Sequence, residues 1–324
     1  MDVRRRRFLR LAGGLAGMPA VARLAWAQAY PARAVRILVA TTAGGATDLA
    51  ARVIAQWLAE RLGQSFFVEN RPGGNNNIGT EAAARAPADG HTLFMANSVN
   101  TINASLYQKL SYNFIDDFAP IVRTVSSPLL MMVHPSVPAK TVPELIAHLK
   151  ANPDKLAIAS GGHGSTGHMA GALFQMLTGT KMVHVPYRGE SVAMTDVLGG
   201  QAQVAFATTG SALSYAKAGT VRTLAVTTKE RLPGLDVPPL ADLFPGFDVS
   251  GWSGLCAPKK TPAEIVALLN KEINAALADP KVKQRIADLG GTSPGGSSAD
   301  FAKFLADETE RWAKVIKHAG IKTN

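Results

Sequence analysis

Short apolar runs alternate with segments of helical spacing through the first part of the chain. Val35–Ala40, Phe66–Glu69 and Thr92–Ala96 have the length and the β-branched or aromatic content of strands. Between them, Thr47–Leu62 and Ile78–Arg85 repeat apolar residues every three to four positions, as amphipathic helices do. Strands that alternate with helices predict a parallel sheet covered by helices on both faces.

The same alternation recurs over residues 141–226. We expect, in order, helix Thr141–Lys150, strand Leu156–Ala159, helix His168–Thr178, strand Met182–Val185, helix Ser191–Leu198, strand Val204–Ala207, helix Ala212–Ala218 and strand Val221–Val226. The last third turns helical, with a helix start at Thr261-Pro262 and an amphipathic helix over Asp300–His318. Two apolar segments, Val122–Val133 and Val249–Ala257, would cross between the halves and form a hinge. The pattern therefore predicts an α/β protein with a first lobe of residues 28–128 plus 250–324 and a second lobe of residues 129–249.

The first 27 residues have the features of an export signal. A cationic stretch over residues 4–10 precedes the small and apolar segment Leu11–Leu24, and Ala25-Trp26-Ala27 fits the A-x-A cleavage rule. Arg5-Arg6-Arg7-Phe8-Leu9-Arg10 also resembles a twin-arginine signal, so export by either the Sec or the Tat route is open. The alternative is a basic amphipathic helix that stays attached. Cleavage after Ala27 predicts a periplasmic protein.

Composition and charge narrow the class of protein. The chain has 324 residues, 47% hydrophobic and 18% charged, which is an ordinary globular composition of two-domain size. Its net charge is +10, but residues 1–27 hold six Arg and one Asp, which leaves about +5 for the rest. The remaining cations are scattered without interleaved aromatic residues, so nucleic-acid binding is not expected. Cys256 is the only cysteine and lies in an apolar run, which predicts a buried small hydrophobe.

Two turns rich in Gly, Ser and Thr, one in each predicted lobe, follow an apolar run and open a helix. A helix start points unpaired backbone N–H groups and the positive end of the helix dipole outward, which favours an anion. Two such turns predict two jaws that face one small anionic ligand. The candidate ligand-binding residues in them are Thr41, Thr42, Ala43, Gly44, Gly45, Ala46, Thr47 and Asp48 in the first turn, and Gly162, His163, Ser165, Thr166, Gly167 and His168 in the second.

Further candidates follow other predicted strands, where an open α/β sheet presents its ligand groups. They are Asn97 and Ser98, Tyr187 and Arg188, Thr208, and Asn75, which could equally be a turn residue. Asp48 could cap the first helix or accept a hydrogen bond from a ligand amine. Tyr187 could stack on a ligand or hydrogen-bond to it, and Arg188 could pair with a distal carboxylate or lie in solvent.

Two kinds of chemistry are disfavoured. Gly162-x-Gly164-x-x-Gly167 matches a dinucleotide-binding turn, but Pro186-Tyr187-Arg188 stands where that site needs an acidic residue. An α/β enzyme that uses the 162–167 glycine loop, periplasmic or nucleotide-dependent, remains the alternative function. His163 and His168 are five positions apart, which is wrong for one helix face, and we interpret His184 as a core histidine. We therefore expect no metal and no cofactor.

The chain resembles the periplasmic solute-binding receptors of tripartite tricarboxylate transporters, often called the Bug family. The resemblance covers nearly all of the chain after the export signal. Its motifs, in order, are Asn70-Arg71-Pro72-Gly73 with Asn77-Ile78-Gly79, His184-Val185-Pro186-Tyr187-Arg188-Gly189, Thr195-Asp196-Val197-Leu198-Gly199-Gly200-Gln201, Ala218-Gly219-Thr220-Val221-Arg222-Thr223-Leu224-Ala225-Val226, Gly251-Trp252-x-Gly254-Leu255 and Ala257-Pro258-x-x-Thr261-Pro262.

The resemblance implies a two-lobed clamshell of the periplasmic-binding-protein type, each lobe a mainly parallel sheet flanked by helices. It implies a monomeric receptor without catalysis that binds a small carboxylate, such as a di- or tricarboxylate, an amino acid or an aromatic acid, and docks on a membrane permease. The chain departs from the family where prolines and an aromatic ring are usual, at Ala40-Thr41-Thr42-Ala43. It also departs at Asn75-Asn76, where small residues are common, and at His163, where Asn is frequent. The missing ring leaves room for a bulkier or more polar ligand.

Overall fold

The computed structural model describes residues 30–322, so the predicted export signal lies outside the described residues. The strands are β1 (Val35–Val39), β2 (Phe66–Asn70), β3 (Thr92–Asn97), β4 (Phe118–Val133), β5 (Ala157–Ser160), β6 (Val183–Pro186), β7 (Val204–Thr208), β8 (Arg222–Val226) and β9 (Ser250–Pro258). The helices are α2 (Ala46–Leu62), α3 (Asn77–Ala84), α4 (Ser98–Leu106), α5 (Val142–Ala151), α6 (Thr166–Thr178), α7 (Glu190–Leu198), α8 (Thr209–Ala218), the 3-10 helix η1 (Leu240–Asp242), α9 (Ala263–Ala278), α10 (Pro280–Asp288) and α11 (Ser298–Ala319).

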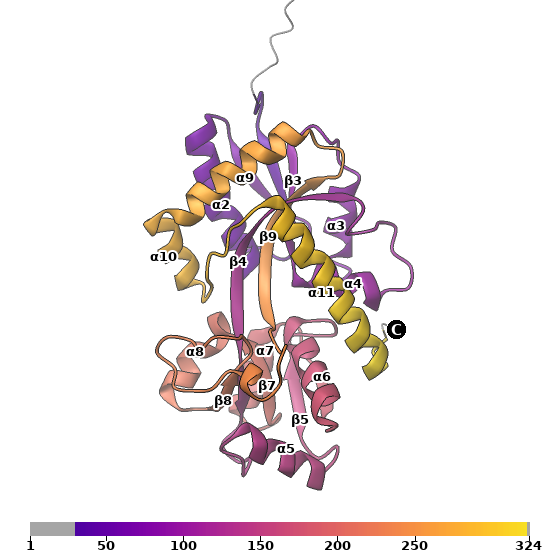
Figure 1. Cartoon of the computed structure of the whole chain (residues 1–324), viewed down its shortest axis with the longest axis vertical. Helices are drawn as coiled ribbons and strands as arrows, with labels where there is room; N and C mark the ends of the chain where they lie inside the picture. The colour runs from indigo at the N-terminus through magenta and orange to yellow at the C-terminus, as the bar shows by residue number, and fades with distance from the viewer. Residues whose placement is uncertain (1–29, 323–324) are drawn as a thin grey trace, which may run out of the picture.

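Two long strands join the two halves of the molecule. β4 and β9 run side by side and antiparallel from one half toward the other (Figure 1). In the first half, the parallel strands β2, β1 and β3 continue onto β9 and then β4. In the second half, the parallel strands β6, β5 and β7 pair through β7 with the later part of β4, whose other edge pairs with β8. The predicted crossings are therefore long strands that extend both sheets.

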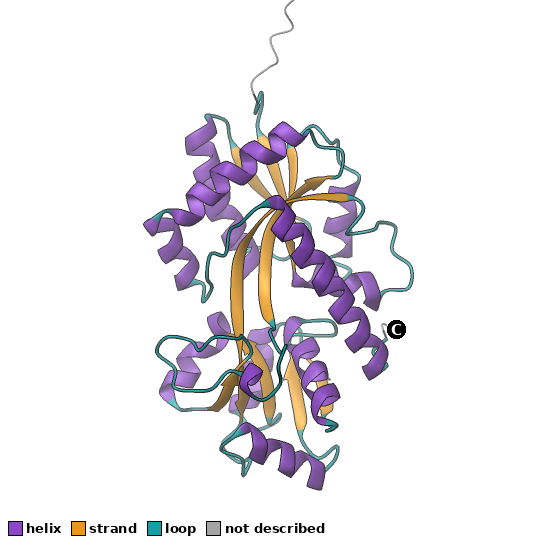
Figure 2. Ribbon diagram, viewed as in Figure 1, coloured by secondary structure: helices purple, strands orange, loops and turns teal. Residues whose placement is uncertain are grey.

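Helices cover both sheets (Figure 2). In the first half, one apolar cluster lies between the sheet and α2 and α9, with Ile37, Ile54 and Leu269 among its buried members. In the second half, α5 and α6 bury their apolar faces against β4, β5 and β7. α11 spans from the first half to the second, where its Trp312 and Val315 join the core around α6 (Figure 1). This helix thus packs on both halves.

The structure confirms the α/β fold with two lobes and helix-flanked sheets. Each sheet is mixed but mainly parallel, because β9 alone runs antiparallel to the other strands in the first half and β4 alone does so in the second. The division at residues 128/129 and 249/250 stays a prediction. The sequence pattern did not predict α4, which follows β3 directly and consists mostly of Ser, Asn and Thr, residues that are weak helix formers. Cys256 is fully buried, as expected.

Candidate functional site

A cavity of about 440 Å³ lies between the two halves. Both halves contribute to its lining: Ala46, Thr47, Leu49, Asn97, Ser98, Val99, Val125, Ser127, Thr166, Thr208, Gly210, Ser211, Gly251, Trp252, Ser253, Asp288 and Leu289. Six of the sequence-predicted site residues lie in this lining, namely Ala46, Thr47, Asn97, Ser98, Thr166 and Thr208. The other predicted residues lie outside it.

Four helices begin at this cavity, two from each half: α2, α4, α6 and α8. Each one directs its unpaired N–H groups and the positive end of its dipole toward the helix start. α4 and α6 have side-chain caps, because Asn97 accepts from the Val99 amide and Ser165 accepts from the His168 amide. α2 and α8 have no side-chain cap. The first amides of these two helices are therefore available to a ligand.

The floor of the cavity comes from the two crossing strands. β4 contributes Val125 and Ser127, and β9 contributes Trp252 and Ser253. A further wall residue, Leu289, directly follows α10. These residues were not predicted, because the crossing segments show only as apolar runs and nothing in the sequence pattern places the end of α10 beside them.

Hydrogen bonds to Asp48 stabilise the first predicted turn. The Asp48 carboxylate is almost fully buried and accepts from the Gly44 amide (2.9 Å), Arg52 Nε (3.0 Å) and Asn70 Nδ2 (2.9 Å). Burial favours a higher pKa, but the hydrogen bonds from Arg52, Gly44 and Asn70 outweigh it and lower the pKa of Asp48 below its ordinary value. Thr41, Thr42, Ala43, Gly44 and Gly45 lie in the same turn, outside the cavity lining. The bonds of Asp48 favour the role of holding this turn rather than that of contacting a ligand.

We expect Asp48→Ala to lower the free energy of unfolding by about 1–3 kcal/mol, since it leaves the Gly44 amide, the Arg52 guanidinium and the Asn70 amide without their shared acceptor. The pKa of Asp48 is lower in the folded protein than in the unfolded chain. The stabilisation is therefore fully present at a pH above the unfolded-state pKa, and it is lost as the pH falls through the folded-state pKa. Urea unfolding of both proteins should give a constant difference from pH 8 to pH 5 that shrinks below about pH 4. Asp307→Ala, which breaks an exposed pair with Lys303, is the control; equal losses for the two variants would contradict this role.

Asn75 and its neighbour Asn76 fasten α3 to α4. Both residues have a left-handed backbone, with φ of 52° and 72°. Asn75 Nδ2 donates to Asn103 Oδ1 (3.0 Å), and Asn76 Nδ2 donates to Asn97 Oδ1 (3.0 Å). Asn97 thus receives one bond from the turn while it caps α4. These contacts favour the turn interpretation of Asn75 and make it a support of the cavity wall.

The second predicted turn reaches the cavity at one residue. Thr166 Oγ1 lies 2.7 Å from Ser98 Oγ, which joins the start of α6 to the start of α4 across the two halves. Gly162 and Ser165 lie before α6, outside the lining. Gly167 is buried in α6, where an added methyl group would overlap the carbonyl oxygen of Phe206 in β7. This glycine therefore permits close packing of helix on strand.

Tyr187 and Arg188 also lie outside the lining. Tyr187 packs against an apolar cluster of the second half, and burial together with Asp196 raises the pKa of its hydroxyl. Arg188 is exposed. The next acidic residue, Glu190, was not predicted: its carboxyl group accepts from both the amide and the hydroxyl of Thr208 at the start of α8. Burial raises the pKa of Glu190, although the hydrogen bonds from Thr208 oppose this shift.

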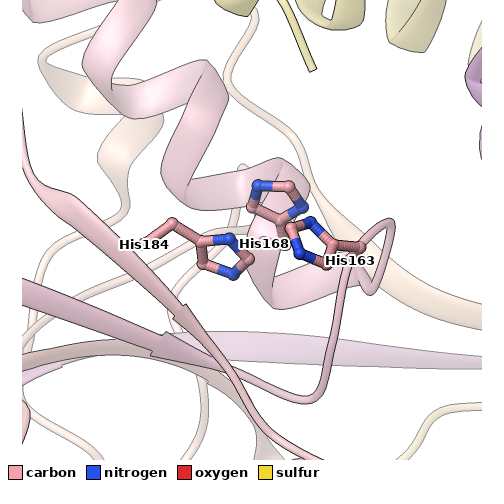
Figure 3. Close-up of side chains that lie close together, drawn as sticks. All are labelled: His163, His168 and His184. Atoms are coloured by element: carbon pink, nitrogen blue, oxygen red, sulfur yellow. The ribbon is translucent and has the colours of Figure 1, made fainter. Parts of the chain in front are cut away.

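Three histidines lie together in the second half: His163 before α6, His168 in its first turn and His184 in β6 (Figure 3). The rings of His168 and His184 stack at a centroid distance of 3.7 Å. Burial and neighbouring imidazoles lower the pKa of His168 to about 3 and that of His184 to about 4. Sequence spacing could not reveal the cluster, because His184 enters it from another element. None of the three lines the 440 Å³ cavity.

Among residues 30–322, no helix is long and apolar enough to cross a membrane.

Comparison with known proteins gives concordant results. Residues 50–321 match the model of the tripartite tricarboxylate transporter family receptor. Protein BugT of Bordetella pertussis is 35% identical over 300 residues, covering 91% of this chain and 92% of that protein.

Solved structures agree with this match. An R. palustris protein solved with adipate is 34% identical, with a TM-score of 0.79, covering 90% of this chain and 99% of that one. MatC from Rhodopseudomonas palustris with bound malate is 30% identical, with a TM-score of 0.76, covering 89% and 100%. The periplasmic binding protein BugD is 32% identical, with a TM-score of 0.76, covering 91% and 100%.

Proposed function

Since the chain belongs to the tripartite tricarboxylate transporter receptor family, we propose that it captures a small carboxylate between its lobes and presents it to a membrane permease. Its family and fold are those of solute-binding receptors. We further propose that it acts in the periplasm as a monomer, after export directed by residues 1–27 and cleavage after Ala27.

One observation carries the carboxylate proposal: two helices without side-chain caps, α2 from one half and α8 from the other, begin at the same cavity. Among the residues that the structure describes, no Lys, Arg or His lines that cavity, and Asp288 is the single charged lining residue. An anion there would be bound by backbone amides, small hydroxyl groups and helix dipoles. Relatives solved with adipate and with malate support a carboxylate as that anion.

The rest of the lining suits the carbon body of the ligand. Leu49, Val99, Val125 and Leu289 are aliphatic, and Trp252 adds an aromatic side chain. Covering this apolar surface with a ligand is favourable because it removes the surface from water. The end of the ligand away from its carboxylate therefore needs no charged partner. The proposed ligand is therefore a carboxylate with a compact, mainly apolar body.

The paired strands β4 and β9 would let the lobes move as a clamshell. We propose that lobe 1 comprises residues 28–128 plus 250–324 and lobe 2 residues 129–249, so that one crossing lies within β4 and the other at the start of β9. Closure would be secured by contacts such as that between Ser98 and Thr166, 2.7 Å apart.

The glycine loop offers less support for the enzyme alternative. Gly164 has a positive φ of 72°, and a side chain there would overlap Leu106 of α4. Gly167 meets β7. The third glycine of a dinucleotide-binding turn also packs on a strand, but the second glycine must be open to the phosphate, and here Gly164 packs against Leu106. We therefore propose that the chain has no catalytic activity.

Thermal-shift and calorimetric measurements against adipate, malate, benzoate and the neutral diamide of adipic acid test the function. We expect at least one acid to raise the Tm by several degrees at a hundredfold excess over its Kd, as binding to the folded state requires. The diamide should leave the Tm unchanged, because it lacks the charge that the helix ends bind. Binding of the diamide without binding of any acid would contradict the proposal.

A further inference from the structure

The imidazoles of His163, His168 and His184 come from three different elements and have their ligand nitrogens within 4.8 Å of one another (Figure 3). We propose that these three side chains bind a divalent transition-metal ion of the Zn²⁺ type, at a site separate from the carboxylate cavity. Neutral imidazole nitrogen is a preferred ligand of Zn²⁺, Cu²⁺ and Ni²⁺. Three histidines with water in the fourth position form a common open zinc site.

The hydrogen bonds of His184 leave the correct nitrogen for a metal. Its Nε2 lies 2.7 Å from Ser160 Oγ. That hydroxyl already donates its proton to the Gly162 carbonyl (3.1 Å), so it accepts from the Nε2–H of His184. Nδ1 of His184 therefore carries a free lone pair. A ring oriented by a hydrogen bond from its second nitrogen is the usual arrangement of a metal-binding histidine.

His168 also has a defined tautomer. Its Nδ1 accepts from the Gly164 amide (3.1 Å), so Nε2 carries the proton and the Nδ1 lone pair faces the turn that bears His163. A metal bound to Nδ1 would replace this hydrogen bond. His163 is exposed, which gives the ion a way in from solvent.

The distances between ring centroids match those expected around one zinc ion for two of the three histidine pairs. Tetrahedral coordination with Zn–N of about 2.0–2.1 Å places the centroids of two bound rings roughly 5 Å apart. The His163 centroid lies 5.2 Å from that of His184 and 5.7 Å from that of His168. His168 and His184 are stacked at 3.7 Å and must separate by roughly 1.5 Å to bind one ion in this geometry. A cavity of about 410 Å³, which both rings line, provides the space for this movement.

Calorimetry with Zn²⁺ on the untagged, EDTA-treated protein at pH 7.5 tests the site. We expect one Zn²⁺ per chain, and His163→Asn should weaken its affinity at least tenfold. Because His163 is exposed, this variant should keep the Tm of the metal-free protein. His148→Asn, a histidine outside the cluster, should leave the affinity unchanged and is the matched control. With Co²⁺ as the probe, the wild type should show the intense visible absorption of tetrahedral cobalt, and His163→Asn should lose it.

Two results would overturn the proposal: no saturable Zn²⁺ binding by the wild type, or equal Zn²⁺ affinity in His163→Asn and the wild type. Neither result would bear on carboxylate binding, which the ligand panel measures independently without added metal.

Discussion

Thr47→Asp is expected to weaken binding of the carboxylate ligand at least a hundredfold. Thr47 stands in the first turn of α2 and lines the cavity, so the new carboxylate would occupy the helix end that the ligand needs. Two like charges about 4 Å apart repel by about 4 kcal/mol at an effective dielectric constant of 20. Since about 1.4 kcal/mol corresponds to a tenfold change in Kd, a hundredfold loss is a conservative expectation.

Thr47→Asn is the matched control, because it has nearly the shape of Asp without the charge. We expect it to weaken binding less than tenfold in the same calorimetric titration. An acidic residue in the first turn of a helix is favourable, so Thr47→Asp should keep the Tm of the ligand-free protein. If Asp and Asn at this position weaken binding equally, the helix end does not bind the anion.

Gly167→Ala is expected to have the largest effect on stability, a loss of about 3 kcal/mol or a fall in Tm of roughly 5–10 °C. Gly167 lies in α6, and a methyl group there would overlap the backbone carbonyl oxygen of Phe206. Both sides of this contact are backbone, which cannot move aside as a flexible side chain could. α6 would have to move away from β7 and would lose apolar packing around Phe174.

Gly199→Ala provides the comparison for this stability measurement. A methyl group at Gly199 would make only an ordinary contact, 3.5 Å from the carbonyl oxygen of Thr195. Its φ of −80° is open to any residue, so we expect a change within about 0.5 kcal/mol by urea unfolding. A Gly167→Ala variant as stable as Gly199→Ala would show that the close approach of α6 to β7 is not required.

The α/β fold could be predicted because its parallel strands are short buried runs and most of its helices are amphipathic. Val35–Ala40 and Thr47–Leu62, for example, correspond within a residue to β1 and α2. Part of the cavity wall was predictable, since Thr47 and Thr166 line the cavity and stand at helix starts that follow strands. The particular residues were less so, because a turn such as Thr41–Gly45 looks identical in sequence whether it contacts a ligand or only its own Asp48.

Features that depend on tertiary contacts could not be predicted. α4 is stabilised by a capping box between Asn97 and Asn100 and by buried amides, not by helix propensity. The cavity floor from Ser127 and Trp252 depends on how β4 pairs with β9. His184 joins His163 and His168 only because β6 pairs with β5 beside the start of α6. Sequence spacing carries no signal of any of these contacts.

A crystal structure of the protein with a carboxylate identified by the ligand panel tests the central claim most directly. We predict one carboxylate group in the cavity between the lobes, with its oxygens about 3 Å from first-turn backbone nitrogens of α2 and α8. A ligand bound outside this cavity, or a carboxylate held instead by a cationic side chain such as Arg188, would contradict the account.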